Sequence, residues 1–336
     1  MRLIFTTGDT NGIGIEVLVK ALVKSEMQEL LQEHELTFCG NAETFKEYAV
    51  KAKLPAIFKN DGFSIGDVFL KMLECENYAP VEFGHETKRA AQLAVESLEK
   101  AARATVLKEF DAVITLPISK HALQSVGWNF PGQTEMMAHA AGAQNPMMIL
   151  CSGRLRVALA TVHIPLKNVA ASLFKEKIVE KISALFKTLK ADFSTSNPKI
   201  AVLGLNPHAG ESGGIGSEEI DIIQPAIAEA FKNGIDVDGP HPADGFFAHG
   251  AFKNYDGVLA MYHDQGLIPL KLIAGGAGVN VTAGLPIVRT SPDHGTAYGI
   301  AGKDVAKGTS TAEAIQLAIE IVESRERFLK EMQPNF

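Results

Sequence analysis

Residues 257–303 read GVLAMYHDQGLIPLKLIAGGAGVNVTAGLPIVRTSPDHGTAYGIAGK, and the interpretation of the whole chain depends on this stretch. It opens with an apolar run that ends in His263 and Asp264, and it closes with a small-residue turn at 294–297. Three polar residues stand among apolar neighbours between these ends: Lys271, Asn280 and Arg289. The stretch therefore combines a candidate metal ligand, two cations suited to an anionic ligand and a turn that a ligand can approach closely.

Length and composition indicate a globular protein of two lobes. A chain of 336 residues exceeds what one small core organises, and 46% hydrophobic with 21% charged residues is ordinary for such proteins. The net charge of -7 argues against nucleic acid or an anionic membrane as the main partner. A local basic pocket for a phosphorylated metabolite is compatible with this charge.

Targeting signals and cysteine usage favour the cytoplasm. The apolar run at the N-terminus is too short for a signal peptide, and no run approaches the roughly 20 residues that span a bilayer. Cys39, Cys75 and Cys151 are far apart and form no C-x-x-C pair, so we expect buried neutral thiols in a reducing compartment. We therefore expect a cytoplasmic protein with no membrane partner.

Predicted strands and helices alternate along the chain. Short apolar runs predict buried strands at 3–7, 36–40, 111–116, 147–151, 156–162 and 200–205. Apolar residues at helical spacing predict helices at 15–23, 86–107 and 168–189. Such alternation implies a largely parallel sheet covered on both faces. Residues 117–146 mix polar groups with turn formers and are a candidate crossing between lobes.

A glycine-rich turn, GDTNGIG at 8–14, follows the first predicted strand. A strand, a turn of this kind and a helix open many nucleotide-binding α/β folds. The spacing matches neither G-x-G-x-x-G nor the P-loop, however. A tight strand-to-helix turn explains these glycines at least as well as direct contact with a ligand.

Three predicted strands end at or near a histidine: 158–162 at His163, 201–205 at His208, and 258–262 at His263. Ligands of α/β sheets collect beyond the carboxyl ends of strands, and three neutral imidazoles suit a divalent ion with one position left for substrate. A single histidine in such a place is more often a hydrogen-bonded residue at the end of an element. Without a local motif such as H-E-x-x-H, the spacing leaves both interpretations open.

Other polar groups also have two interpretations. Asp244 lies in the turn PHPADG at 240–245 and is either a general base or orienting carboxylate, or an ordinary turn aspartate. The glycines of 204–219 either bring backbone amides to a ligand or form a flexible link. The apolar neighbours of Lys271 and Arg289 favour an inward, phosphate-facing role over a solvated one.

At this point the chain resembles a known family, the 4-hydroxythreonine-4-phosphate dehydrogenases of pyridoxal phosphate biosynthesis. The resemblance covers nearly the whole chain. Its most specific segments are GLNPHAGE at 204–211, YHDQG at 262–266 and NVTAGLPIVRTSPDHGTA at 280–297. Weaker segments are GIGIE at 12–16, LPISK at 116–120 and PADGFF at 242–247.

The resemblance implies a fold like that of the isocitrate and isopropylmalate dehydrogenases, with two α/β lobes and a cleft between them. We expect residues 1–125 plus 285–336 to form one lobe built from both termini. Residues 126–284 would form a middle lobe with metal, substrate and dimer contacts. The family works as a homodimer whose active site lies at the subunit interface, and it acts on a phosphorylated small molecule.

The same resemblance assigns site residues. The implied metal ligands, shared between the two partners, are His163, His208 and His263. The implied substrate-binding residues are Gln133, Thr134, Lys271, Asn280 and Arg289. The implied cofactor turn, on the adenosine side, is His294, Gly295, Thr296 and Ala297. We expect Asp244 and Lys271 to take part in catalysis, with Asp264 as another candidate carboxylate for moving protons or orienting a ligand.

Two positions depart from the family pattern. Gln133 stands where the family commonly has histidine, and Gly245 stands where threonine is expected. Glutamine can hydrogen-bond a substrate, but it cannot titrate near neutral pH. The precise substrate is therefore less well specified than the fold.

The implied enzyme is an NAD (or NADP)-dependent 4-hydroxythreonine-4-phosphate dehydrogenase. It would use one divalent metal ion per subunit (zinc, magnesium or cobalt) to oxidise 4-phosphooxy-L-threonine to a β-keto acid. That acid would decarboxylate to 3-amino-2-oxopropyl phosphate. One alternative is a related dehydrogenase of another phosphorylated hydroxy acid, such as threonate or erythronate phosphate. Another is a protein that binds metal and a phosphorylated metabolite without redox activity.

Overall fold

The computed structural model describes residues 1–332, and the chain divides into two compact units. The first unit comprises Met1–Pro146 and Leu285–Val322. The second comprises Met147–Gly284 and the segment from Glu323 onwards. Compared with the expected lobes, residues 126–146 fall in the first unit, where Met136 and Met137 pack into its core. The chain beyond Val322 falls in the second, and 333–336 lie outside the described residues.

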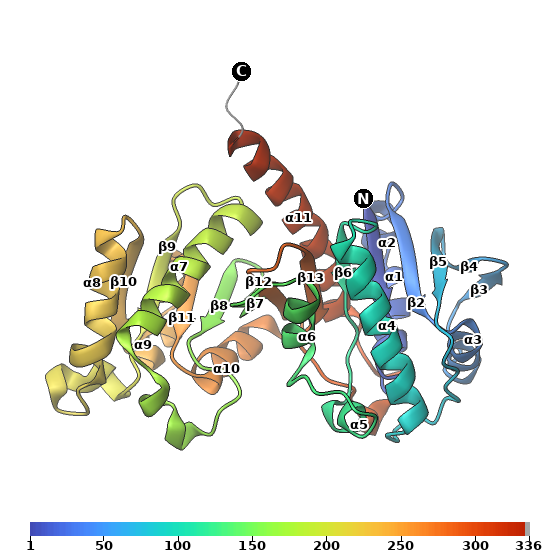
Figure 1. Ribbon diagram of the computed structural model, residues 1–336, viewed down its shortest axis with the longest axis horizontal. Coiled ribbons are helices and arrows are strands. Elements are labelled where there is room, and N and C mark those ends of the chain that lie inside the picture. The colour runs from blue at the N-terminus through green and yellow to red at the C-terminus, as the bar shows by residue number, and fades with distance from the viewer. Residues whose placement is uncertain (333–336) are drawn as a thin grey trace. The chain divides into compact units, whose positions relative to one another are not determined.

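Strands of the first unit follow the order β13-β6-β1-β2-β5-β4-β3 (Figure 1). The strands are β1 (Arg2–Thr6), β2 (Glu35–Gly40), β3 (Ile57–Lys59), β4 (Gly62–Ile65), β5 (Val68–Glu74), β6 (Ala112–Ile114) and β13 (Val288–Pro292). The helices are α1 (Gly14–Leu22), α2 (Ser25–Leu30), α3 (Ala42–Lys51), α4 (Lys88–Val106), α5 (Lys120–Gln124), α6 (Gln133–Ala140) and the start of α11 (Thr309–Met332). Pairing is parallel from β13 through β5 and antiparallel for β3, β4 and β5.

Strands of the second unit follow the order β10-β9-β11-β8-β7-β12 (Figure 1). The strands are β7 (Met147–Ser152), β8 (Leu155–Leu159), β9 (Lys199–Leu203), β10 (Asp236–His241), β11 (Gly257–Ala260) and β12 (Val279–Ala283). The α-helices are α7 (Lys175–Asp192), α8 (Gln224–Lys232), α9 (Ala243–Ala248) and α10 (His263–Ala274). β10, β9, β11 and β8 are parallel, so their carboxyl ends lie at one edge of the sheet.

Each unit buries apolar strands, and the predicted α/β class is confirmed. Leu3, Ile4 and Phe5 of β1 are fully buried, as a parallel strand covered on both faces requires. The predicted helix at 86–107 is α4, which begins where the Thr87 side chain accepts a hydrogen bond from the Ala90 N–H. No helix among the described residues is long and apolar enough to cross a membrane.

The helix predicted at 168–189 is partly wrong. Two short 3-10 turns, Leu166–Asn168 and Ala170–Ser172, occupy its first part. Phe174 is then extended, with φ -148° and ψ 156°, and α7 begins only at Lys175. Leu173 is also extended, with φ -95° and ψ 131°. Apolar spacing alone did not reveal this break, because two extended residues interrupt a helix without removing the apolar pattern on either side.

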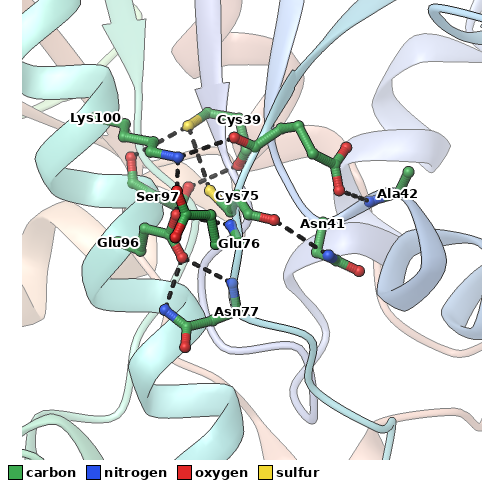
Figure 2. Close-up of polar contacts among 10 residues, drawn as sticks. Cys39, Asn41, Ala42, Cys75, Glu76, Asn77, Glu96, Ser97 and Lys100 are labelled. Atoms are coloured by element: carbon green, nitrogen blue, oxygen red, sulfur yellow. Dashed lines mark hydrogen bonds and ion pairs between the residues drawn. The ribbon is translucent and has the colours of Figure 1, made fainter.

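A polar cluster joins β2, β5 and α4 in the first unit (Figure 2). Cys39 and Cys75 are buried free thiols whose Sγ atoms lie 3.9 Å apart, which confirms the expected burial of both. The Ser97 hydroxyl donates to the Cys39 carbonyl at 2.6 Å. Glu96 on α4 forms an ion pair with Lys100 at 2.8 Å and accepts from the backbone N–H groups of residues 76 and 77. The carboxylate thus links the helix to the chain that leaves β5.

These contacts set the pKa of Glu96. Burial alone would raise the pKa, but the donors from Lys100, Asn77 and Glu76 outweigh it and lower the pKa to about 2 from the usual 4.5. Because the folded-state pKa lies below the unfolded one, the contribution to stability is complete above pH 4.5. It is lost as the pH falls through about 2.

We expect Glu96→Gln to lower the free energy of unfolding by about 1–2 kcal/mol at pH 7, since a charge-assisted acceptor is lost. The difference from the unmutated protein should shrink as the pH falls from 4.5 towards 2. Urea unfolding at several pH values measures both effects. Glu99→Gln, at an exposed position of the same helix, is the control and should leave stability unchanged. An equal loss at pH 7 and pH 3 would contradict the assignment.

Candidate active site

The carboxyl ends of β8, β9 and β11 lead to the three predicted metal ligands in the second unit. His163 follows β8, His208 follows β9, and His263 is the first residue of α10, directly after the turn that ends β11. Because β11 pairs in parallel with both β8 and β9, the three chains leave the sheet at the same edge. The three histidines therefore lie beyond the carboxyl ends of strands, as expected.

His163 and His263 lie close together. Their ring centroids are 5.8 Å apart, and both line a cavity of about 310 Å³ with Tyr262 and Asp264. Asp264 Oδ1 lies 2.7 Å from His263 Nδ1. A carboxylate that accepts from Nδ1–H leaves the Nε2 lone pair available for a metal ion, which is how carboxylates commonly orient ligating histidines.

His208 lines a second cavity, of about 550 Å³, in the same unit. Its lining also includes Asp244, in the first turn of α9, and Gln265 of α10. Tyr262 and Asp264 line both cavities. The predicted catalytic Asp244 thus shares a cavity with His208, and Asp264 lines both this cavity and the one that contains His163 and His263.

The described part of one chain does not bring three His, Cys, Asp or Glu side chains together in a group able to hold a metal ion. The three-histidine centre therefore stays a prediction. The donors fit such an ion chemically, because His163 and His263 are neighbouring imidazoles and Asp264 orients one of them. His208 would complete a set that leaves room for substrate.

The chain around His208 adopts an unusual conformation. Five successive residues, 208–212, have positive φ between 43° and 78°, and only Gly210 among them is glycine. Glu219 is 1% exposed and accepts hydrogen bonds from the backbone N–H groups of Leu205 and Asn206, both at 2.7 Å. Sequence analysis missed Glu219, because its partners lie 13 and 14 residues away.

Gln265 is a second residue that sequence analysis missed. Its Oε1 accepts from the Met261 N–H at 2.7 Å, and its Nε2 donates to the Gly204 carbonyl at 2.6 Å. The side chain therefore joins the end of β11 to the end of β9. Its place between His263 and Gly266 in the YHDQG segment was the available signal.

Lys271 and Asn280, predicted to bind substrate, belong to the second unit. Lys271 is exposed on α10, in contrast to the expected inward orientation, because the outer side of this helix carries residues 268, 271 and 272. Asn280 on β12 is partly buried, and its Oδ1 is buried with no hydrogen-bond donor among the described residues. Such an oxygen is suited to a donor supplied by a ligand.

Arg289 on β13 is a buried cation of the first unit, 3% exposed. Its Nε and Nη2 donate to the Thr115 hydroxyl at 3.0 and 2.7 Å, and Nη2 donates to Gln133 Oε1 at 2.6 Å. Burial lowers the pKa of Arg289 to about 10, against the opposing effect of Glu135, so the guanidinium remains charged at neutral pH. The expected inward orientation of Arg289 is confirmed.

Gln133 and Thr134 open α6, whose first residue is Gln133. Gln133 Nε2 donates to the Leu116 carbonyl at 3.0 Å, which fixes the amide between β6 and Arg289. Gln133 at the start of α6 therefore contacts the guanidinium of Arg289, and Thr134 follows it on the same helix.

The predicted cofactor turn, His294–Ala297, also lies in the first unit and rests on the glycine-rich turn after β1. Ile13 N–H donates to the Thr296 carbonyl at 3.0 Å, and a Cβ added at Gly12 would lie 2.7 Å from that oxygen. The Tyr298 hydroxyl donates to Asp9 at 2.6 Å. The glycine at position 12 therefore serves close packing between two turns, a third role that neither earlier interpretation included.

One nitrogen of the predicted cofactor turn makes no hydrogen bond to the described residues. Nε2 of His294 is buried and finds no partner among the described residues. Ala297 adopts a left-handed conformation with φ 47°, which ends the turn before Tyr298. A buried ring nitrogen without a protein partner fits a ligand that supplies one. The turn is therefore compatible with a nicotinamide dinucleotide.

Comparison with known proteins identifies the class. The fold is that of crystal structures of 4-hydroxythreonine-4-phosphate dehydrogenase, an α/β oxidoreductase. The enzyme from Klebsiella pneumoniae superposes with a TM-score of 0.81 at 34% identity, over 96% of this chain and 99% of that one. A structure from Salmonella typhimurium, described as a putative member, gives 0.80 at 34% identity, over 95% and 99%.

Sequence comparison then identifies the family. The model of the pyridoxal phosphate biosynthetic protein PdxA matches residues 20–318. The 4-hydroxythreonine-4-phosphate dehydrogenase of Bacteroides thetaiotaomicron is 41% identical over 331 residues, 97% of this chain and 90% of the relative. That of Sulfurihydrogenibium sp. is 42% identical over 323 residues, 95% and 98%. The chain belongs to the PdxA family and is a dehydrogenase, as its resemblance implied.

Proposed function

We propose that this chain oxidises 4-phosphooxy-L-threonine with NAD as hydride acceptor, within pyridoxal phosphate biosynthesis. The observation that carries this proposal is the buried Arg289, held by Gln133 and Thr115 at the start of α6 in a chain of the PdxA family. A phosphorylated substrate would supply an anion to this cation in addition to the nearby carboxylate of Glu135. The family implies a nicotinamide cofactor, and NAD rather than NADP is our proposal.

The residues divide the work in this proposal. Arg289, with Thr134 and the first N–H groups of α6, would bind the phosphate or carboxylate of the substrate. Asn280 would accept a hydrogen bond from the substrate, and Asp244 or Lys271 would take the hydroxyl proton as hydride leaves for the nicotinamide. In the resulting β-keto acid the bond to the carboxylate breaks, its electron pair moves towards the ketone to give an enolate, and carbon dioxide leaves. Protonation of the enolate at carbon gives 3-amino-2-oxopropyl phosphate.

A divalent metal (zinc, magnesium or cobalt) held by His163, His208 and His263 would supply Lewis acidity to the substrate oxygen when bound. Asp264 orients His263 for this role through the 2.7 Å contact between Oδ1 and Nδ1. Tyr262 lines the same two cavities as Asp264 and would limit the access of water.

We also propose a homodimer with the active site at the subunit interface. The outer face of α10 supports it, because three large apolar side chains there are exposed: Ile268 (57%), Leu272 (78%) and Ile273 (46%). Adjacent apolar side chains of this size commonly mark a protein–protein contact. Since α10 also carries His263, a partner on this face would lie next to the predicted metal ligands.

The cytoplasmic location stays a prediction.

NAD reduction by the purified, metal-loaded protein tests the proposed function. We expect absorbance near roughly 340 nm, where reduced nicotinamide absorbs, to rise with 4-phosphooxy-L-threonine. Gln133, in the place of the common family histidine, gives reason to assay threonate and erythronate phosphates in parallel. A higher kcat/KM for either would select the alternative substrate, and no reduction with any of the three would overturn the proposal.

A further inference from the structure

We propose that Glu219 is a positioning residue for His208, holding the turn that presents this histidine to a metal ion. The inference deepens the proposed function and rests on its metal centre. Glu219 touches neither His208 nor any predicted substrate residue in the contacts described above. Its effect would pass through the backbone of residues 204–212.

The Glu219 carboxylate is buried and used on both oxygens. Oε1 accepts from the backbone N–H groups of Leu205 and Asn206, each at 2.7 Å. Oε2 accepts from Asn206 Nδ2 at 2.9 Å. These donors immediately follow β9 and precede Pro207 and His208. The carboxylate therefore fixes the direction in which the chain leaves the strand towards the histidine.

The turn that follows needs such support. His208 has φ 51°, and Ala209, Glu211 and Ser212 share its left-handed conformation. A left-handed conformation costs a non-glycine residue roughly 1–2 kcal/mol, so four of them persist only where surrounding contacts hold them. Within the turn the Ala209 N–H donates to the Asn206 carbonyl at 3.1 Å, and the hydrogen bonds to Glu219 hold Leu205 and Asn206, which lead into it.

Two glycines make room for the carboxylate. A Cβ added at Gly210 would lie 2.5 Å from Glu219 Oε2, and one added at Gly204 would lie 3.2 Å from Oε1. Gly204 is also the residue whose carbonyl accepts from Gln265, next to His263. The Glu219 carboxylate therefore lies on the inner side of the turn, in space that a side chain at position 204 or 210 would occupy.

Only a carboxylate can accept a hydrogen bond from every donor around this side chain. All its neighbours donate: two backbone N–H groups at Oε1 and the Asn206 amide at Oε2. A glutamine of the same shape must turn its NH₂ group towards one of these donors, whichever way the amide is placed. Glu219→Gln therefore removes the hydrogen bonds of one carboxylate oxygen and leaves the volume of the side chain nearly unchanged.

Metal affinity tests the inference directly. We expect Glu219→Gln to bind Zn²⁺ and Co²⁺ roughly 10- to 100-fold more weakly by calorimetry, the usual cost of losing a residue that orients a ligand. The visible absorption of bound Co²⁺ should change as well, because it reports ligand geometry. Glu218→Gln is the matched control: Glu218 accepts only from Asn206 Nδ2 among the described contacts, at 2.8 Å, and its loss should change affinity by less than about threefold.

A double-mutant cycle shows whether the effect passes through His208. In the His208→Ala background, Glu219→Gln should weaken metal binding by no more than about twofold. If the loss is the same with and without His208, Glu219 acts elsewhere and the inference is wrong. Wild-type affinity and an unchanged Co²⁺ spectrum in folded Glu219→Gln would also overturn it, leaving the proposed function intact.

Two further outcomes are separable. If Glu219→Gln does not fold, Glu219→Asp carries the same test, since it keeps the charge but draws the carboxylate back from Leu205 and Asn206. Failure of both variants to fold would make Glu219 a determinant of stability and would overturn its positioning role. A wild-type protein that binds neither Zn²⁺ nor Co²⁺ would remove the metal centre, and with it both proposals.

Discussion

The His208→Ala protein is expected to bind divalent metal more weakly, by at least about 100-fold, and to lose at least about 100-fold in turnover. His208 is the only predicted ligand in the larger of the two cavities, which it shares with Asp244. Lewis acidity at the substrate oxygen is worth several kcal/mol of barrier, and each 1.4 kcal/mol is tenfold in rate. Metal content per subunit and NAD reduction in the presence of added Zn²⁺ or Co²⁺ measure the two effects.

His249→Ala is the control for this change. His249 is exposed at the end of α9 and lines neither cavity, so metal content and turnover should stay at wild-type values. His208 is itself exposed, so its removal should leave the thermal midpoint nearly unchanged. Full activity with unchanged metal content in His208→Ala would remove the three-histidine centre.

Arg289→Met should lower kcat/KM for the phosphorylated substrate by roughly 1,000-fold while leaving the KM for NAD within about threefold. The reason is the loss of a buried cation whose hydrogen bonds to an anion are worth about 1.5–3 kcal/mol each. Steady-state kinetics with each substrate varied in turn separates the two constants. Thr115 and Gln133 lose their donor as well, so the thermal midpoint should fall and must be measured alongside.

Arg289→Lys separates charge from geometry in the same place. Lysine keeps the cation but cannot supply Nε and Nη2 together to the Thr115 hydroxyl, so we expect an intermediate loss of about 10- to 100-fold. Arg154→Met, at an exposed position of the second unit, is the control for removing an arginine. A lysine variant with wild-type kinetics would show that the fork of donors is unimportant, and a methionine variant with wild-type kinetics would exclude Arg289 from substrate binding.

Features that depend on residues close together in the sequence were predictable. Apolar runs that stop at a polar residue predicted the strands and placed His163, His208 and His263 beyond strand ends. The apolar neighbours of Arg289 predicted its burial. Lys271 has similar neighbours but is exposed, because on a helix the neighbours in sequence point in several directions, whereas in a parallel strand covered on both faces they share its burial.

Features that depend on distant partners were not predictable. The left-handed run from His208 to Ser212 contradicts the ordinary preference of four of its residues, and the contact with Glu219 that holds it lies beyond any local window. The packing of Gly12 on Thr296 joins segments 284 residues apart, so a glycine motif could suggest a tight turn but could not show which turn lay against it. The break at Leu173 and Phe174 was hidden for another reason, since the apolar spacing does not show where the backbone becomes extended.

The amide of Gln133 has a consequence for how this chain responds to acid. Arg289 can only donate to it and the Leu116 carbonyl can only accept from it, so the amide has one possible orientation. A histidine there would need to stay neutral, with its bare nitrogen towards the guanidinium, and protonation near pH 6.5 would set two positive charges against each other. Glutamine reproduces the neutral form of that histidine at every pH. Gln133 therefore places no titrating group against Arg289, whereas a histidine in the same position would introduce one.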